Sequence, residues 1–224
     1  MSKYSTKSKH HIIYKTSTGL IVPGGSTIAN MDEKGGGLVG WAIKLMKDGI
    51  DPNKAKEEAG EIGTLTHYRI LCDLEGKTPE MGEYSQYIQD KSSKCMESYS
   101  KWKSEHKIEP IKLEFPIVFD GNDDIKPFGG TIDFYGKIDG ALTLKDFKTS
   151  SGLYDSAYIQ IMGYWYLLSR VDLMTDYVGL LHLPKTEGDT FTDKNLTDKE
   201  RKVYWNIFQK YLGIWWDKKE LKNG

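Results

Sequence analysis

Apolar residues recur along this chain with two spacings, one typical of helices and the other typical of strands. A repeat of three to four residues predicts helices over 38–46, 53–74, 83–102 and 155–170, and a capping-box pattern at 197–200 announces a last helix. Alternation of apolar and polar residues predicts strands over 111–119, 128–138, 141–149 and 177–183. The order along the chain is therefore helices, three strands, a helix, a strand and a helix.

The length and composition are those of one globular unit. The chain has 224 residues, of which 38% are hydrophobic and 28% are charged, and this balance excludes a disordered protein. No internal repeat or interdomain linker interrupts it. We expect a flexible N-terminal arm over 1–10 and a single domain over 11–224, with a helical part to about residue 105 and a core from about residue 106.

Charge and cysteine content limit the possible partners only in part. A net charge of -1 neither supports nor excludes nucleic acid, because a local basic groove does not appear in a whole-chain sum. Cys72 and Cys95 are the only cysteines and lack the spacing of a zinc or iron-sulfur site, so we expect reduced core thiols. No apolar run reaches the roughly 18 residues of a membrane span, and no signal peptide is evident. We therefore expect an intracellular (cytoplasmic) protein without membrane contact.

Three polar features have ordinary explanations. The pair His10-His11 lies in the predicted arm and has no fixed partner ligands. The run Gly35-Gly36-Gly37 is interpreted as a flexible turn, because no Gly-Lys-Ser/Thr follows it as in a phosphate loop. The lysines of the 83–102 helix are typical of a solvated face, and a DNA-binding patch is the alternative.

Candidate chemistry is concentrated in the hairpin predicted around Asp139-Gly140. Four Asp-x-Lys triplets occur in the chain, but only Asp146-x-Lys148 ends an apolar run, so only there do both side chains share one face of a sheet. Asp-Gly favours a two-residue type I′ turn, and this register places Asp133 directly opposite Asp146. A β-bulge would break the register.

Two facing carboxylates imply a bound cation. With Cβ atoms about 5 Å apart, the charges of Asp133 and Asp146 repel each other and destabilise the strand pair. A divalent ion between them reverses that sign, and oxygen ligands of this kind suit Mg²⁺ or Mn²⁺. Lys148 would then lie where an attacking water or a developing phosphate charge needs stabilisation. A surface hairpin with incidental acids remains the alternative.

Further candidates lie on neighbouring elements. Gln160 and Tyr164 form the only Gln-x-x-x-Tyr in the chain and share one helix face, as a site pair or as a surface pair. His67 lies on the apolar stripe of its helix, where a hydrogen-bonded core histidine is the alternative to a metal ligand. Glu114 is a possible further carboxylate, but we interpret it as an exposed sheet residue and leave it out of the predicted site.

The candidates form an ordered set that resembles a known family. The set consists of His67, Gly130-x-x-Asp133, Asp146-x-Lys148 and Gln160-x-x-x-Tyr164. Over about residues 55–185 the chain resembles the RecB-like exonuclease branch of the PD-(D/E)XK nuclease superfamily, which includes CRISPR-associated, phage recombination and mitochondrial genome-maintenance exonucleases. Many CRISPR-associated members carry four cysteines for an iron-sulfur cluster. Two cysteines cannot supply one, so the resemblance favours the cluster-free members.

The resemblance implies a fold, a reaction and roles for particular residues. The implied fold is α/β, a mixed central β-sheet flanked by helices. The implied metal ligands are His67, Asp133, Asp146 and the carbonyl of Phe147. Lys148 would be the catalytic lysine, and Gln160 and Tyr164 would orient it or contact the DNA backbone. The implied cofactor is Mg²⁺ or Mn²⁺, without an iron-sulfur cluster.

The expected function is metal-dependent hydrolysis of DNA. We expect an exonuclease that acts on single-stranded DNA or DNA ends in replication, recombination or repair. No helicase motif is present, so a helicase, polymerase or single-strand-binding protein is an expected partner. A structure- or sequence-selective endonuclease with the same site, and a DNA-binding scaffold without turnover, are the two alternatives.

Overall fold

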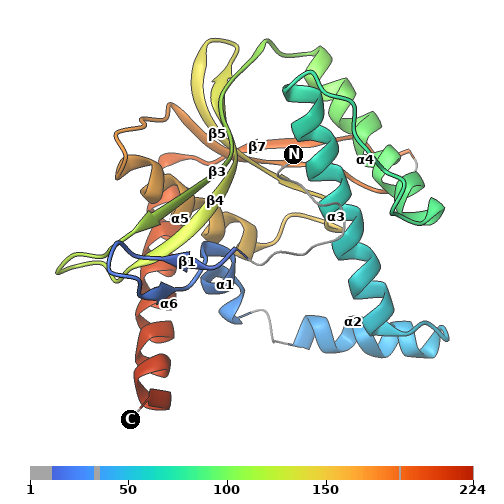
Figure 1. The fold of residues 1–224 in the computed structure, drawn as a ribbon. Coiled ribbons are helices and arrows are strands. Elements are labelled where there is room, and N and C mark those ends of the chain that lie inside the picture. The colour runs from blue at the N-terminus through green and yellow to red at the C-terminus, as the bar shows by residue number, and fades with distance from the viewer. Residues whose placement is uncertain (1–11, 33–35, 187, 224) are drawn as a thin grey trace.

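The strands of the core form one mixed sheet with helices on both of its faces (Figure 1). The computed structural model describes residues 12–32, 36–186 and 188–223. Its strands are β1 (Tyr14–Lys15), β2 (Ile21–Val22), β3 (Ile108–Phe119), β4 (Phe128–Ile138), β5 (Ala141–Lys148), β6 (Tyr177–His182) and β7 (Thr192–Asn195). Its helices are α1 (Gly25–Ala29), a 3₁₀ turn (Asn30–Asp32), α2 (Gly36–Lys47), α3 (Pro52–Leu74), α4 (Gln86–Ser104), α5 (Asp155–Ser169) and α6 (Asp198–Asn223).

The sheet confirms the predicted α/β architecture. Its strand order is β3-β4-β5-β6-β7, with β5 and β6 parallel and the other neighbours antiparallel. Helix α5 makes the crossover between the two parallel strands, as such a connection requires. At the β4–β5 turn, Asp139 has φ 52° and Gly140 has φ 88°, the positive values that a type I′ turn needs. The register follows, with Ile138 paired to Ala141.

Each face of the sheet packs against its own group of helices. One core cluster combines residues of α1, α5 and α6 with the sheet, and the other combines residues of α3 and α4 with the opposite face. Figure 1 shows α3 and α4 together on one side of the strands, away from α5 and α6. The two predicted thiols, Cys72 and Cys95, are buried and unpaired, as expected.

Strands β3 and β4 each change the face that their side chains present midway along their length. Ile132 packs in the α5–α6 cluster, whereas Phe134, two residues later, packs in the α3–α4 cluster. A regular strand would place both on one face. On β3, Glu114 has φ 43°, and its neighbours Leu113 and Phe115 pack against opposite clusters. Glu114 and Asp133 therefore lie where the two strands change faces.

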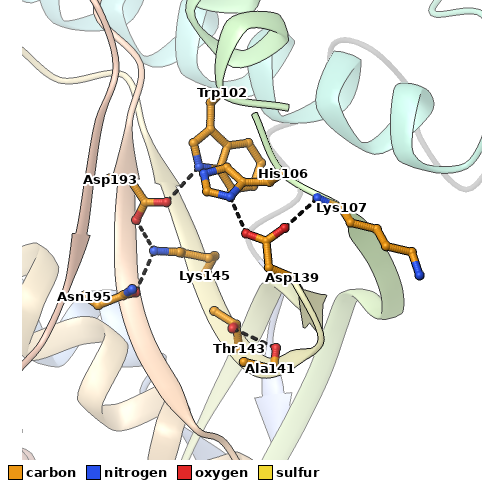
Figure 2. Close-up of polar contacts among 9 residues, drawn as sticks. All are labelled: Trp102, His106, Lys107, Asp139, Ala141, Thr143, Lys145, Asp193 and Asn195. Atoms are coloured by element: carbon orange, nitrogen blue, oxygen red, sulfur yellow. Dashed lines mark hydrogen bonds and ion pairs between the residues drawn. The ribbon is translucent and has the colours of Figure 1, made fainter. Parts of the chain in front are cut away.

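A buried lysine fastens the edge strand β7 to the sheet. Lys145 is only 1% exposed, and its ammonium group pairs with Asp193 and donates to Asn195 Oδ1 at 2.7 Å (Figure 2). The second carboxylate oxygen of Asp193 accepts from Trp102 Nε1 at 2.7 Å. The network joins α4, β5 and β7, and it compensates the cost of burying the lysine charge.

Some sequence predictions need correction. Strand β7 and the short elements β1, β2 and α1 were not predicted, because they are short and β7 is wholly polar. The interpretation of the glycine run as a turn is wrong for Gly36 and Gly37, which open α2. The predicted helix start at 83 is wrong by three residues, because Ser85 caps α4. The arm over 1–10, His10-His11 and Gly35 lie outside the described residues.

Candidate metal and catalytic site

Strand pairing brings the hairpin carboxylates to the same row of the sheet. The β4–β5 register runs from Ile138–Ala141 to Phe134–Lys145, and the next positions along it are Asp133 and Asp146. Here the ladder gives way to a side-chain contact, because the backbone N–H of Phe147 donates to Asp133 Oδ2 at 2.9 Å. The predicted register is confirmed up to this row. The carboxylate of Asp133 is thus fixed against β5.

Glu114 extends this row onto β3, so the interpretation of Glu114 as an exposed residue is wrong. The β3–β4 register pairs Leu113 with Phe134 and Phe115 with Ile132, which leaves Glu114 beside Asp133. The side chain is partly buried. Sequence alternation assigned Glu114 to the solvent face because it assumed a flat, regular strand, whereas the positive φ at Glu114 turns the strand over.

Helix α3 packs on the face of the sheet opposite α5 and contacts this row of carboxylates. A Cβ atom at Gly63 would lie 3.3 Å from Thr149 Oγ1, so the glycine lets the helix approach the end of β5 closely. One turn later, His67 Nε2 donates to the Phe147 carbonyl at 2.9 Å, and His67 Nδ1 lies 3.5 Å from Asp133 Oδ2. Histidine, carbonyl and carboxylate therefore share one small volume.

Three side chains can hold a metal ion together. His67, Glu114 and Asp133 each offer one ligand atom, and these atoms lie within 4.8 Å of one another. Burial, with the Asp133 charge added, raises the pKa of Glu114 to about 7. Burial opposes the charged form of His67, but the Asp133 charge outweighs it and raises the pKa of His67 to about 9. The cluster thus holds protons that a cation would displace.

Asp146 stands apart from this group and faces the lysine. It is 2% exposed, and its Oδ2 lies 2.7 Å from Lys148 Nζ. Apart from this ion pair, no described residue is recorded as donating a hydrogen bond to this buried oxygen. Burial raises the pKa of Asp146 to about 6, against the opposing charge of Lys148. A buried carboxylate oxygen without a directed donor fits the chemistry of a cation ligand.

A hydrogen-bond chain continues from the lysine into α5. Lys148 Nζ donates to Gln160 Oε1 at 3.0 Å, and Gln160 Nε2 donates to the Tyr164 hydroxyl at 2.6 Å. Burial, together with the charges of Asp146 and Asp133, raises the pKa of Tyr164 well above its usual range. The tyrosine therefore stays protonated and orients the glutamine, which in turn fixes the lysine.

Gly130 has a steric role in the same region. A Cβ atom at Gly130 would lie 2.5 Å from Tyr164 Cε1, and one at Gly25 of α1 would lie 2.9 Å from the same atom. The ring of Tyr164 is thus clamped between two glycine backbones. This explains why a glycine stands three residues before Asp133, a feature that sequence alone presents only as a pattern.

The structure brings the predicted site residues together, at the middle of β4, the end of β5 and the facing sides of α3 and α5. His67, Asp133 and the Phe147 carbonyl lie together, and Asp146 faces Lys148 beside them. Together with Glu114, five residues offer oxygen or imidazole atoms, and the ammonium group of Lys148 lies next to them. This donor set fits a hard divalent cation such as Mg²⁺ or Mn²⁺.

The known proteins that resemble this chain share little of its sequence. No family model matches the sequence, and no curated protein does. Among solved structures, SSO0001 has 15% identity and a TM-score of 0.33, over 53% of this chain and 55% of its own. A chain from Eubacterium rectale whose name proposes an exonuclease has 11% identity and a TM-score of 0.46, over 68% and 64%.

LHK-Exo in complex with dAMP has 11% identity and a TM-score of 0.37, over 91% of this chain and 95% of its own. This chain therefore spans less than two thirds of the first two neighbours and nearly all of the third. Because these three TM-scores lie below 0.5, the functional proposal rests on the site itself. Within the described residues, no helix has the length and apolar character to cross a membrane.

Proposed function

We propose that the chain is a metal-dependent DNA nuclease of the PD-(D/E)XK type. One observation carries the proposal: Lys148 Nζ lies 2.7 Å from the buried Asp146, beside a second cluster of ligands centred on Asp133. A structural ion pair would not need the three further groups, two of them carboxylates, that gather next to it. A cation site with a neighbouring positive charge is an arrangement that catalyses phosphodiester hydrolysis.

Mg²⁺ or Mn²⁺ is the proposed cofactor, held by Asp133 and Asp146 with His67 and the Phe147 carbonyl, and by Glu114 in addition. Such an ion, when bound, polarises the phosphate and lowers the pKa of water. Asp133 is already oriented by the Phe147 N–H, and His67 by the Phe147 carbonyl. These side chains therefore need little rearrangement to bind an ion.

Lys148 is the proposed catalytic residue, because its ammonium group can stabilise negative charge on the reacting phosphate. Gln160 and Tyr164 are positioning residues. Gln160 accepts from Lys148 and donates to Tyr164, so the lysine cannot leave the site without breaking the chain of hydrogen bonds. Exonuclease action on single-stranded DNA or DNA ends is the finer proposal, and it derives from the sequence resemblance.

The test compares linear and circular DNA with a matched lysine control. End-labelled linear single strands, linear duplex and closed single-stranded circles are incubated with Mg²⁺, Mn²⁺ or EDTA. We expect degradation of linear DNA only, dependent on metal and lost in Lys148→Ala. Lys126→Ala is the control, because Lys126 belongs to another Asp-x-Lys triplet and lies on the surface against Glu220.

Each other outcome has a distinct meaning. Cleavage of circles as fast as linear strands replaces the exonuclease by an endonuclease with the same site. Cleavage that survives Lys148→Ala removes the proposed catalytic lysine. No cleavage of any substrate refutes the nuclease proposal and leaves the scaffold alternative.

A further inference from the structure

A pocket of about 360 Å³ opens beside the candidate catalytic site. This volume lies within the range of ligand-binding clefts. The pocket lies among α2, α3, α4 and the segments that follow β5 and β6. The lining residues that bear on its chemistry are Trp41, Tyr87, Lys91, Ser150, His182 and Lys185.

The backbone connects this pocket to the catalytic lysine. Ser150 lies two residues after Lys148, and two extended residues span at most about 7 Å. The Ser150 carbonyl accepts from His182 Nε2 at 2.7 Å, and the Leu183 N–H donates to the Lys148 carbonyl at 2.8 Å. The pocket wall is therefore fixed to the strand end that presents Lys148.

Two lysines of the pocket have no carboxylate partner. Among the described residues, no carboxylate oxygen lies within 4.0 Å of Lys91 or Lys185, whereas Lys94 and Lys103 of the same helix pair with Glu97 and Asp73. Burial lowers the pKa of Lys185, Cys95 opposes this shift, and the nearby charge of Lys91 adds to it. Two neighbouring ammonium groups that no described carboxylate pairs with favour the binding of an anion.

The pocket also contains two acids, but neither neutralises these lysines. Glu58 lies 3.9 Å from Lys54 on its own helix, and Asp189 is exposed to solvent. Within the part of the chain that the structure describes, no carboxylate therefore neutralises Lys91 or Lys185. Phosphate groups are the common biological anions that bind pairs of lysines.

Two aromatic rings of the pocket are open to solvent. Trp41 is 39% exposed and Tyr87 is 51% exposed, although rings of this size are usually buried. Lys91 lies 5.9 Å above the Tyr87 ring, so a cation and an aromatic face adjoin each other. Open rings beside lysines combine stacking surfaces with phosphate contacts, the pair of features that binds unpaired nucleotides.

We propose that this pocket binds unpaired nucleotides of single-stranded DNA next to the scissile phosphate, with bases against Trp41 and Tyr87 and phosphates at Lys91 and Lys185. The inference rests on the proposed function for the identity of the polymer, and it assigns the substrate class to single strands. A duplex keeps its bases paired and stacked inside the helix, so it cannot offer them to these rings.

Binding in EDTA tests the pocket without cleavage. Fluorescence anisotropy of a labelled oligothymidylate, and of a duplex of equal length, measures Kd for the wild type and four variants. We expect tighter binding of the single strand and a loss on the order of tenfold in Tyr87→Leu and in Lys91→Gln. Lys91→Gln should also reduce the slope of log K against log salt by about 0.7, the value for one lost phosphate contact.

Two variants serve as matched controls and should bind like the wild type. Tyr177→Leu removes an equally exposed tyrosine, 50% against 51%, that lies outside the pocket. Lys94→Gln removes a lysine one helical turn from Lys91, and this lysine pairs with Glu97. Circular dichroism of each variant confirms that the fold is retained.

The outcomes separate this inference from the proposed function. Equal Kd values in the pocket variants and the wild type overturn the pocket, even if the protein degrades DNA. Equal binding of duplex and single strand overturns the assignment to unpaired nucleotides. Binding that depends on Tyr87 and Lys91 in a protein that cleaves nothing supports the pocket and refutes the nuclease.

Discussion

Replacing Glu114 by glutamine tests whether the carboxylate cluster is strained without a cation. Glu114 lies beside Asp133 in the row of acids, and burial together with that charge raises its pKa from 4.5 to about 7. The ionised form is therefore disfavoured in the folded protein. Glutamine has nearly the same shape and no charge, so Glu114→Gln removes this strain and leaves the backbone of β3 in place.

The expected magnitude follows from the pKa. A rise from 4.5 to about 7, at about 1.4 kcal/mol per pH unit, corresponds to roughly 3 kcal/mol. Because the folded pKa lies above the unfolded one, the stability that protonated Glu114 contributes is fully present below pH 4.5 and is lost as the pH rises through about 7. The variant should therefore gain on the order of 2 to 3 kcal/mol relative to the wild type between about pH 5 and pH 8.

Urea unfolding in EDTA at the two pH values measures this gain. The amide of glutamine adds a cost that does not depend on pH, so the informative quantity is the change in the stability difference between the two pH values. Glu109→Gln is the control, because Glu109 lies on the same strand, is exposed and pairs with Lys107. Saturating Mn²⁺ should stabilise the wild type more than Glu114→Gln.

A stability difference that is the same at both pH values would refute this reasoning, because Glu114 would then carry no ionisation strain. Equal stabilisation of both proteins by Mn²⁺ would separately remove Glu114 from the ligand set. The two measurements distinguish an acid that is merely buried from one that binds metal.

Three further predictions address packing, the buried lysine and metal affinity. Gly130→Ala should lower the free energy of unfolding, measured by urea denaturation, by about 1 to 3 kcal/mol, because the new Cβ would lie 2.5 Å from the Tyr164 ring. Wild-type stability of the variant would show that the ring can move away. Lys145→Met should cost about 3 to 5 kcal/mol by leaving Asp193 without its cation, and Lys145→Met with Asp193→Leu should recover much of the loss. Calorimetry should show that Mn²⁺ affinity rises between about pH 6 and pH 9 and that binding releases protons. His67 has a pKa raised to about 9 and must lose its proton to bind the ion, so an affinity that does not change with pH would contradict this role.

Local features of the sequence determined much of the candidate site. The Asp139-Gly140 turn fixed the hairpin register, because both residues tolerate the positive φ of a type I′ turn. Helical spacing placed Gln160 and Tyr164 on one face of α5, where they now join Lys148 in a hydrogen-bond chain. These relations depend on residues close in sequence, so the pattern of the chain predicts them.

Only the tertiary structure decided the position of Glu114, the edge strand and the pocket. Glu114 reaches Asp133 because β3 and β4 change faces between two helix layers, and the packing of distant helices sets that change. Strand β7 has a polar sequence and is held by Lys145, 48 residues before Asp193. Such contacts join segments far apart in the chain, and their energy comes from burial and charge pairing that no local spacing encodes.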